Sequence, residues 1–365
     1  MKYLLIMDSF KGSISSKDGE TAVREGLGSG EIIPFSDGGE GFAECIEYIC
    51  GGERIYFPTF DSYGREISSY YLRIDDTAVI ETALADGLMT VGKDHPNIIY
   101  ARSFGTGETI KRALEDGCKK LIIGFGGSAV NDGGAGALQA LGARIIGEKG
   151  LAALAGEWCV GIDLENLTPL LKEAEIIFAC DVDNPYCGKN GASMVFSPQK
   201  GADEQTAVRM EKSHRAFARF LKEATGKDVS NAPYAGAAGG LAGGLMAVCE
   251  PVIKSGFEVL SDLCSLKEKI EKADIIITGE GKTDKQTLMG KLPMQVTKLA
   301  KSMGKRVVCV SGAITEEGRN LGADLYIPLS HGEITAQMTI ADPVPYLINA
   351  GKIIKNIYEV QENGY

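Results

Sequence analysis

The chain has 365 residues, which exceeds what one ordinary hydrophobic core accommodates and predicts two domains of ~100–200 residues each. Hydrophobic residues make up 44% and charged residues 24% of the chain, which is ordinary for a globular protein and excludes a disordered or collagen-like one. The formal net charge of −11 argues against a nucleic-acid partner, because a phosphate backbone is bound by a basic face.

The cysteines and histidines give little support to a zinc site, because the nine cysteines contain no C-x-x-C pair and there are only three histidines. Scattered unpaired cysteines are typical of a reducing compartment, so we expect a cytoplasmic protein. The segment 229–249 is uncharged but contains five glycines, so its hydrophobicity is too weak for a membrane span. We therefore expect no membrane association.

Short apolar runs predict strands, and many of them are apolar throughout, as in a parallel sheet covered by helices on both faces. In chain order these runs lie at 3–7, 31–35, 53–57, 70–74, 77–81, 120–125, 174–179, 274–278, 306–311 and 325–329. Helical patterns lie at 17–27, 41–49, 108–115, 133–141, 208–222, 291–302 and 346–359. The alternation of strand and helix predicts an α/β protein with right-handed crossovers.

The segment 53–80 differs, because it contains strand, turn and strands without room for a helix, which predicts an antiparallel meander at the start of a second domain. We therefore predict a flavodoxin-like or Rossmann-like parallel-sheet domain made of residues 1–52 and 266–365. Its five strands would be 3–7, 31–35, 274–278, 306–311 and 325–329. A second α/β domain, residues 53–265, would be inserted into it. A head-to-tail division of the chain is the competing layout.

Glycine accounts for 47 residues, about twice the usual share of ~7%. The glycines occur in short bursts between apolar runs, which is typical of tight turns and of close backbone approach. Seven clusters combine glycine with polar residues, at 7–12, 36–41, 103–108, 124–136, 180–185, 234–245 and 278–284.

The cluster at 124–136 follows an apolar strand and precedes a helix, which is the general geometry of a phosphate cradle. It is not a Walker A loop, because no G-K-[ST] follows, and it lacks the spacing of a dinucleotide fingerprint. The polar pair Asn131-Asp132 within it is not needed for packing alone, so we favour a functional role.

The cluster C-D-V-D-N-P at 180–185 places Asp181 and Asp183 on the same side of an extended chain. Two carboxylates beside the amide of Asn184 suit Mg²⁺, or a general base with an orienting group. The alternative is an Asx-turn with one exposed aspartate.

Clusters at the predicted ends of two further strands combine acids with lysines. In 7–12, Asp8 could hold a metal or accept a proton and Lys11 could meet a phosphate, whereas the alternative is a helix capped by Ser15 or Ser16 with Lys11 solvated. The cluster at 278–284 places Glu280, Lys282 and Asp284 near Lys291, which joins acids for a metal to cations for phosphates.

The three remaining clusters have packing alternatives that fit about as well. Asp37 begins a tight turn whose free N–H groups would welcome an anion, or it caps the next helix with Glu40 at the third position. The run at 103–108 either exposes amides and Thr106 to a phosphate or carboxylate, or only packs against the rest of the protein. The run at 234–245 allows a ligand or another helix to approach closely.

The chain shows no G-x-S-x-G elbow, and three histidines leave little choice for a Ser-His-Asp set. Glycine loops, acids and a few lysines at strand ends suit positioning and charge neutralisation more than covalent catalysis. Phosphoryl transfer is the reaction class that needs mainly these.

Taken in order, these motifs resemble the type-1 glycerate kinase family nearly from end to end. The matching runs are D-S-F-K-G-S (8–13), D-G-G-E-G (37–41), F-G-T-G-E (104–108), G-G-S-A-x-N-D-G-G-A-G (126–136), C-D-V-D-N-P (180–185) with F-S-P-Q-K-G-A (196–202), G-A-A-G-G (236–240) and T-G-E-G with D-x-Q-T (278–287). The resemblance implies ATP-dependent phosphorylation of D-glycerate with Mg²⁺ in two α/β domains. It also implies 2-phosphoglycerate as the product, ahead of 3-phosphoglycerate. We expect D-glycerate as the small-molecule partner and a homodimer as one possible assembly.

With this resemblance, we expect Asp181 and Asp183 to serve as Mg²⁺ ligand and hydroxyl-orienting base, in an order left open, and Lys11 and Lys291 to offset phosphoryl charge. The residues expected to bind substrate or phosphate are Asp8, Ser9, Asp37, Gly126, Gly127, Ser128, Asn131, Asp132, Asn184, Gly279, Glu280, Lys282 and Asp284. Arg65 or Arg102 could clamp the substrate carboxylate.

The sequence departs from the family pattern G-E-G-R-I-D-G-Q-T-x-x-G-K at 279–291, where Lys282 stands for arginine and Met289 for a histidine. An arginine-to-lysine change loses a bidentate fork. Two alternatives therefore stay open, namely a kinase for another small hydroxy acid and a non-catalytic binder of a small anionic metabolite.

Overall fold

The computed structural model describes residues 1–91, 97–147 and 159–362, and its tertiary contacts divide the chain into two compact units. Unit 1 comprises Met1–Ser36, Glu44–Cys50 and Phe257–Tyr365, and unit 2 comprises Asp37–Ala43 and Gly51–Gly256. The protein is a mixed α/β chain with parallel sheets, as predicted. The predicted domain boundaries stay a prediction.

Unit 1 is built on a five-stranded sheet in which every neighbouring pair is parallel. Its strands, in spatial order, are β2 (Glu31–Ile32), β1 (Tyr3–Met7), β11 (Ile275–Gly279), β13 (Arg306–Ser311) and β15 (Leu325–Pro328). This is the 2-1-3-4-5 order of flavodoxin-like folds, with the whole of unit 2 placed in the chain between the second and third strands. The strands predicted for this sheet are confirmed, although β2 is only two residues long.

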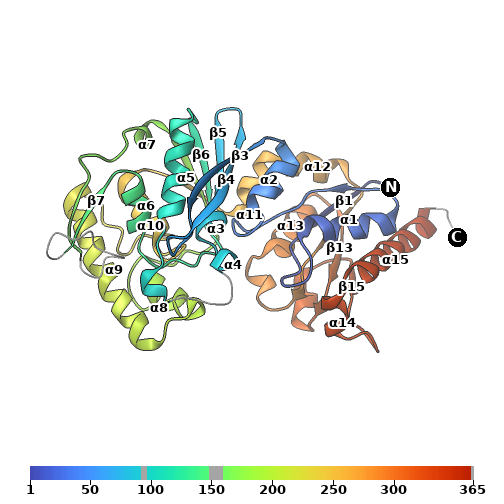
Figure 1. Ribbon diagram of the computed structural model, residues 1–365. Helices are drawn as coiled ribbons and strands as arrows, with labels where there is room; N and C mark the ends of the chain where they lie inside the picture. Colours follow the sequence, from blue (N-terminus) through green and yellow to red (C-terminus); the bar gives the residue numbers. More distant parts are fainter. Residues whose placement is uncertain (92–96, 148–158, 363–365) are drawn as a thin grey trace. The chain divides into compact units, whose positions relative to one another are not determined.

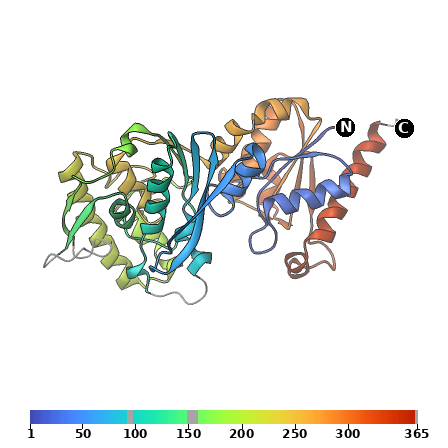
Figure 2. The same cartoon turned by 45° about the horizontal axis from the view of Figure 1, so that its top comes forward.

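The helices α1 (Ser16–Leu27) and α15 (Val344–Glu362) lie side by side in unit 1, as Figures 1 and 2 show. Ser15 caps α1 by accepting the backbone N–H of Asp18 at 3.1 Å, as predicted, and the roles of Asp8 and Lys11 stay predictions. Apolar residues of both helices pack with Leu5, Met7 and Ile277 of the sheet to form the core of the unit. The other helices are α11 (Gly256–Leu263), α12 (Leu266–Lys272), α13 (Leu292–Ser302) and α14 (Ala336–Ala341).

Unit 2 contains a six-stranded sheet that joins a parallel half to an antiparallel half. Its spatial order is β10 (Val252–Lys254), β9 (Glu175–Ala179), β6 (Lys120–Gly124), β5 (Thr77–Glu81), β4 (Glu66–Ile74) and β3 (Glu53–Phe60). The strands from β10 to β5 pair parallel, whereas β5, β4 and β3 form the predicted antiparallel meander.

Most helices of unit 2 follow the strands of this sheet. They are α3 (Ala83–Asp86), α4 (Leu88–Val91), α5 (Phe104–Glu115), α6 (Ala135–Ala140), α7 (Leu170–Glu173), α8 (Ala192–Phe196), α9 (Glu204–Thr225) and α10 (Leu241–Val248). A hairpin of β7 (Arg144–Gly147) and β8 (Cys159–Asp163) and a short parallel pair, β12 (Lys282–Thr283) with β14 (Ala313–Ile314) in unit 1, complete the strands. The helix α2 (Phe42–Cys50) has residues in both units. No described helix is long and apolar enough to cross a membrane.

Candidate functional site

The carboxyl ends of β1, β11 and β13 meet at one edge of the unit 1 sheet, where an open α/β sheet binds its ligands. Asp8 directly follows β1, and its backbone N–H donates to the carbonyl of Gly279 at the end of β11, at 2.9 Å. The Asp8 carboxylate accepts the backbone N–H of Ser9 at 2.7 Å. Gly279 is needed at this place because a Cβ would lie 1.7 Å from the carbonyl oxygen of Val310 on β13. Sheet packing therefore explains Gly279 without a ligand.

Glu280 follows Gly279 and is held in place by its neighbours. Its Oε1 accepts the hydroxyl of Thr287 at 2.5 Å, and its Oε2 lies 3.8 Å from the ammonium nitrogen of Lys291. Burial raises the pKa of the Glu280 carboxyl, Thr287 and Lys291 lower it, and the negative charges of Asp8 and Asp284 raise it further. These side chains therefore form one electrostatic cluster around Glu280.

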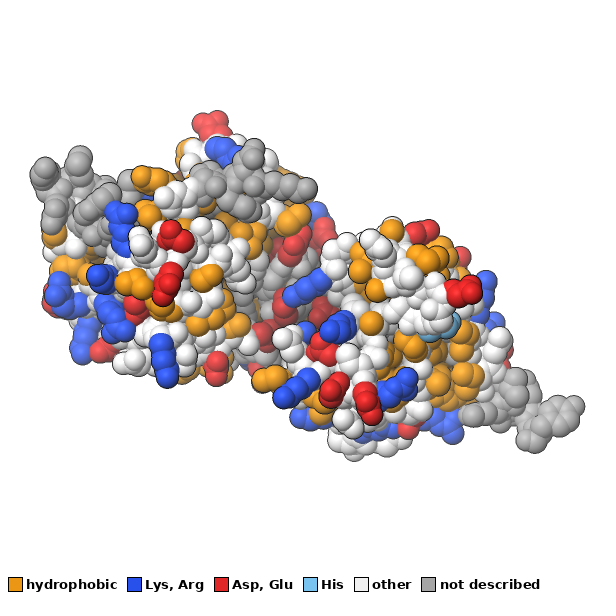
Figure 3. All heavy atoms as spheres, turned by 90° about the horizontal axis from the view of Figure 1, so that it is seen from below, with side chains coloured by type: hydrophobic (Ala, Val, Ile, Leu, Met, Phe, Trp, Pro, Cys, Tyr) orange, Lys and Arg blue, Asp and Glu red, His pale blue; other side chains and the backbone are white. Residues whose placement is uncertain are grey.

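The lysines of this edge remain largely in solvent. Lys11 is exposed, Lys291 ion-pairs only loosely with Glu280, and Lys282 lies 3.4 Å from the Asp284 carboxylate with most of its side chain exposed. Acidic and basic side chains are interspersed over the face of each unit that Figure 3 shows. Exposed ammonium groups can turn toward a phosphate at little cost, and the roles of Lys11 and Lys291 stay predictions.

The glycine-rich loop after β6, residues 124–134, packs against the turn that contains Asp37. A Cβ on Gly126 would lie 2.5 Å from the Cα of Gly39, and Gly127 has a positive φ of 64°. Both positions therefore require glycine. The loop is also joined to the end of α3 and the start of α4. Ala129 N–H donates to the carbonyl of Asp86 at 2.6 Å, and Leu88 N–H donates to that of Gly127 at 2.8 Å.

The polar pair Asn131-Asp132 points into the protein. The Asp132 carboxylate accepts the backbone N–H groups of Ser103 and Gly136, each at 2.9 Å, and that of Gly134 at 3.1 Å. The amide of Asn131 donates to the hydroxyl of Ser193 at 3.0 Å. Both side chains are buried. Direct ligation by either stays a prediction, and these bonds favour an anchoring role for the loop.

Asp181 and Asp183 follow β9 at the carboxyl edge of the second sheet, and both are exposed. The carbonyl of Asp183 accepts the backbone N–H of Tyr234 at 3.2 Å, and the amide of Asn184 donates to the carbonyl of Asn190 at 2.8 Å. These two bonds hold the backbone of the turn that carries both aspartates. Two exposed carboxylates fit Mg²⁺, which is usually held by one or two carboxylates plus substrate phosphates. No group of three potential metal ligands lies together in the described part of the chain.

Two sequence alternatives are decided by the contacts. Asp37 does not cap a helix, because α2 begins at Phe42 and the Asp37 carboxylate accepts the backbone N–H of Gly39 at 3.2 Å. The N–H groups of Gly41 and Ala43 are not free for an anion, since both donate to the Glu81 carboxylate at 3.1 Å. Anion binding by these two N–H groups is therefore excluded, and anion binding by the rest of the turn stays a prediction.

The run F-G-T-G-E at 104–108 is a packing motif. A Cβ on Gly105 would lie 2.1 Å from the carbonyl oxygen of Phe60, and one on Gly107 would lie 2.5 Å from that of Ala137 in α6. Thr106 is buried. The two glycines therefore let α5 approach its neighbours, and the packing alternative accounts for them.

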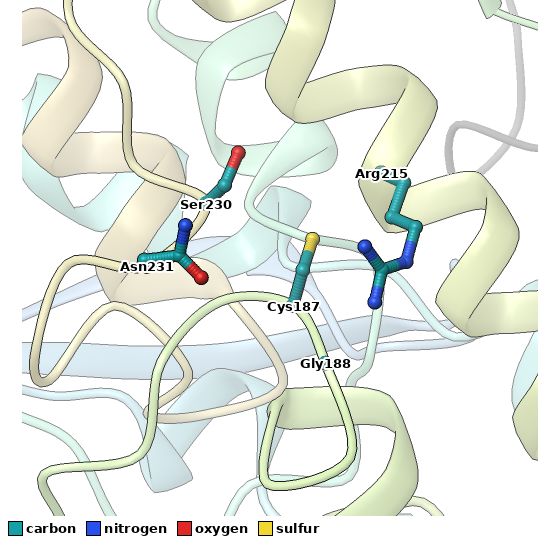
Figure 4. Close-up of a pocket in the computed structure, with 5 residues that line it drawn as sticks. All are labelled: Cys187, Gly188, Arg215, Ser230 and Asn231. Carbon is teal, nitrogen blue, oxygen red and sulfur yellow. The ribbon is translucent and has the colours of Figure 1, made fainter.

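A separate cavity of about 210 Å³ in unit 2 is lined by Cys187, Gly188, Arg215, Ser230 and Asn231 (Figure 4). None of the predicted site residues lines it. Burial raises the pKa of the Cys187 thiol to about 12, which disfavours the reactive thiolate form. The carboxyl-edge clusters therefore remain the candidate site.

Sequence reasoning missed three residues that support these clusters: Glu81, Lys200 and His214. Glu81 binds the two amides described above. Lys200 lies in the run F-S-P-Q-K-G-A, which the sequence offered only as part of a resemblance, and its ammonium group is buried against the glycine-rich loop. His214 lies on α9 with its Nδ1 2.9 Å from the Ser193 hydroxyl. Only the fold shows that these side chains are buried.

The family model described as "Glycerate kinase family" matches residues 3–359 of this chain. The chain belongs to the glycerate kinase family. It is 36% identical to "Glycerate kinase" of Haemophilus influenzae, covering 91% of this chain and 92% of that relative. It is 39% identical to "Glycerate 2-kinase" of Escherichia coli K12, covering 87% and 86%. A crystal structure assigned as glycerate kinase 2 from Salmonella typhimurium LT2 superposes with a TM-score of 0.84 at 33% identity, covering 100% of this chain and 99% of that one.

Proposed function

We propose that this protein transfers the γ-phosphoryl group of ATP to the 2-hydroxyl of D-glycerate, giving 2-phosphoglycerate and ADP. The observation that carries the proposal is a family match over nearly the whole chain, together with acids and lysines that follow the parallel strands of the two sheets. Phosphoryl transfer needs positioned charges rather than a covalent nucleophile, which is what these edges offer.

In this proposal, Asp181 and Asp183 divide the work of holding Mg²⁺ and of accepting the proton of the substrate hydroxyl. A bound Mg²⁺ would neutralise charge on the β- and γ-phosphate oxygens. Lys291, oriented by Glu280 at 3.8 Å, and Lys11 would offset the charge of the transferring phosphoryl group. The glycine-rich loop would bind an anionic group with its backbone N–H groups.

The test is turnover followed by identification of the product. ADP release is measured with MgATP and D-glycerate, with L-glycerate, lactate and glycerol as comparison acceptors, and the product is identified by ³¹P NMR. We expect ADP release with D-glycerate and the phosphorus coupling pattern of 2-phosphoglycerate. Thermal stabilisation by glycerate or ATP without ADP release would instead support a binding protein.

A kinase for another small hydroxy acid is the second candidate, and the departures in the 279–291 segment favour it. Lys282 gives a point charge where the family pattern has a bidentate guanidinium, and Met289 is 81% exposed where that pattern has a histidine. Higher kcat/KM on a longer or dicarboxylic hydroxy acid than on D-glycerate would decide for this candidate.

Three further expectations stay proposals: a cytoplasmic location, the absence of a nucleic-acid partner and assembly as a homodimer. The nine cysteines form no disulfide, and eight of them are buried, which agrees with a reducing compartment. Light scattering at micromolar concentration tests the dimer directly.

A further inference from the structure

A buried lysine, Lys200, is hydrogen-bonded to the glycine-rich loop of unit 2. Lys200 lies in the short 3₁₀ turn Pro198–Lys200 and is 5% exposed. Its Nζ donates to the Ser128 hydroxyl at 3.0 Å and to the Val130 carbonyl at 2.6 Å. One ammonium group therefore joins two residues of the loop to a different segment of the chain.

Burying an ammonium group is costly unless its charge is paired, and the pairing here is incomplete. Both bonded acceptors are neutral, and the favourable charge that acts on Lys200 is that of Asp132, on the same loop. His214 on α9 is the other titratable group that senses the ammonium, and burial keeps its imidazole neutral. A plain packing role would be filled at lower cost by an apolar side chain, so the charge itself calls for an explanation.

The loop's own backbone supplies part of that explanation. The backbone N–H groups of Gly126, Gly127 and Ser128 donate to no residue in the described ranges, whereas Ala129 N–H is bonded to Asp86. Such a row of amides attracts anions when it is held in a fixed conformation. Lys200 is bonded to Ser128, the last residue of this row, and to Val130, and it places a positive charge next to them.

We propose that Lys200 is the positioning residue of the glycine-rich loop, holding Ser128 and Val130 so that the loop binds an anionic group of the substrates, and that its positive charge is required for this. The inference rests on the proposed kinase function and assigns to Lys200 a role in that same site. Lys200 acts through the loop and contacts no reacting atom.

A proton-dependent consequence follows from the burial of this group. Burial lowers the pKa of Lys200 to about 7, and the charge of Asp132 raises it again in part. In the free enzyme the amine therefore loses its charge as the pH rises through neutrality. The pH profile of kcat/KM reports groups of the free enzyme, so it should fall on the alkaline side.

The test compares Lys200→Arg and Lys200→Met with the wild type between pH 6 and 9.5. We expect kcat/KM of the wild type to fall above a midpoint near the Lys200 pKa of about 7. Lys200→Arg should lack this alkaline fall, because a guanidinium keeps its charge. Lys200→Met should lose about 100-fold in kcat/KM at pH 7 and show no alkaline fall, because loop displacement of ~1 Å costs this much.

The matched control is Lys212→Met, which removes an exposed lysine from α9 and should keep the wild-type profile. Thermal unfolding checks that each variant is folded. If Lys200→Met does not fold, the pH profile of Lys200→Arg alone tests the inference. Lys200→Met within threefold of the wild type, or an alkaline fall retained by Lys200→Arg, would overturn the inference. If the wild type turns over no hydroxy acid, the proposed function fails. The Lys200 variants are then compared with the wild type by the pH dependence of their thermal stabilisation by MgATP. Unchanged stabilisation of Lys200→Met, or an alkaline loss retained by Lys200→Arg, would again overturn the inference.

Discussion

The turn after β9 presents Asp181 and Asp183 to solvent while the backbone carbonyl of Asp183 and the side-chain amide of Asn184 are bonded within the protein. Because both side chains are exposed, removing their charge should affect chemistry and leave folding intact. The sequence placed both at a strand end but left open which one holds the metal and which one accepts the proton.

Asp181→Asn and Asp183→Asn separate these roles. The variant that loses the base should lower kcat by about 10²–10⁴ at saturating Mg²⁺, the usual contribution of a general base. The variant that loses the metal ligand should raise the Mg²⁺ concentration that gives half-maximal rate. Both are measured by ADP release over a Mg²⁺ titration. Asp76→Asn, in an exposed turn of the same unit, is the control, and wild-type titrations from both site variants would remove the pair from the mechanism.

His214 gives a prediction about stability rather than catalysis. Burial lowers its pKa to about 4 from 6.5, so the unfolded chain takes up a proton between these pH values and the folded protein does not. Stability contributed by the neutral imidazole is therefore complete above pH 6.5 and is lost as the pH falls toward 4, by up to about 3 kcal/mol.

Urea unfolding at pH 4.5, 5.5 and 7 measures this effect. The His214→Gln variant keeps a polar group beside Ser193 but cannot titrate, so its stability should fall less steeply with acid than that of the wild type. An unchanged slope in the variant would show that other groups cause the acid sensitivity.

At the scale of elements, the packing of α1 on α15 depends on two glycines. A Cβ on Gly26 would lie 2.0 Å from the carbonyl oxygen of Ile348, and one on Gly351 would lie 2.2 Å from that of Val23. Gly19, in the same helix α1, has no atom closer than 3.7 Å to such a Cβ. Gly19 and Gly26 of the same helix therefore differ in the space available for a side chain.

Gly26→Ala should destabilise the protein by about 1–3 kcal/mol, because an added methyl group forces α15 away from α1. Gly19→Ala should stabilise it by about 0.5–1 kcal/mol, the usual gain of alanine over glycine inside a helix. Chemical denaturation of both variants tests the pair. Equal effects at the two positions would mean that helix propensity, and not close packing, determines the outcome.

The sequence predicted the parallel sheet of unit 1 because its strands are apolar throughout, from Leu4–Ile6 to Val307–Val310, and are separated by helical patterns. The short strands β8 and β10 were missed because they are partly exposed and lack a continuous apolar run. The helix α10 was missed because its glycines, such as Gly243 and Gly244, resemble a loop, whereas they allow close approach to neighbouring backbone and to Tyr186.

The acids and lysines of the proposed site stand out in the sequence because they lie in, or shortly after, glycine clusters that follow apolar strands. The supporting contacts could not, because they join residues distant in the chain. Glu81 lies 40 residues from Gly41, Asp132 lies 29 from Ser103, and Lys200 lies 72 from Ser128. Local pattern carries no information about such pairs. The same limit explains why the burial of Asn131 and Asp132 was not foreseen, since a sequence shows that a residue is polar but not whether it is buried.

At the scale of the whole molecule, the chain leaves the unit 1 sheet after β2 and returns to it at β11, with all of the second sheet between. We propose that the two units are separate domains, because each contains its own sheet and its own hydrophobic core. The fragment Gly51–Gly256 holds all six strands of the unit 2 sheet and should therefore fold without the rest of the chain. A cooperative urea transition of the fragment, followed by circular dichroism, is the expected result, and its absence would count against separate domains.

The fragment should nevertheless be less stable than the same unit in the full chain, because it lacks the segment Asp37–Ala43. The Glu81 carboxylate then loses its bonds to the N–H groups of Gly41 and Ala43, and such hydrogen bonds to a charged group contribute about 1–3 kcal/mol. Glu81→Gln isolates this contribution, since it should cost about 1–3 kcal/mol in the full chain and much less in the fragment, where the bonds are already gone. Equal costs in both backgrounds would show that the two amides do not stabilise the unit.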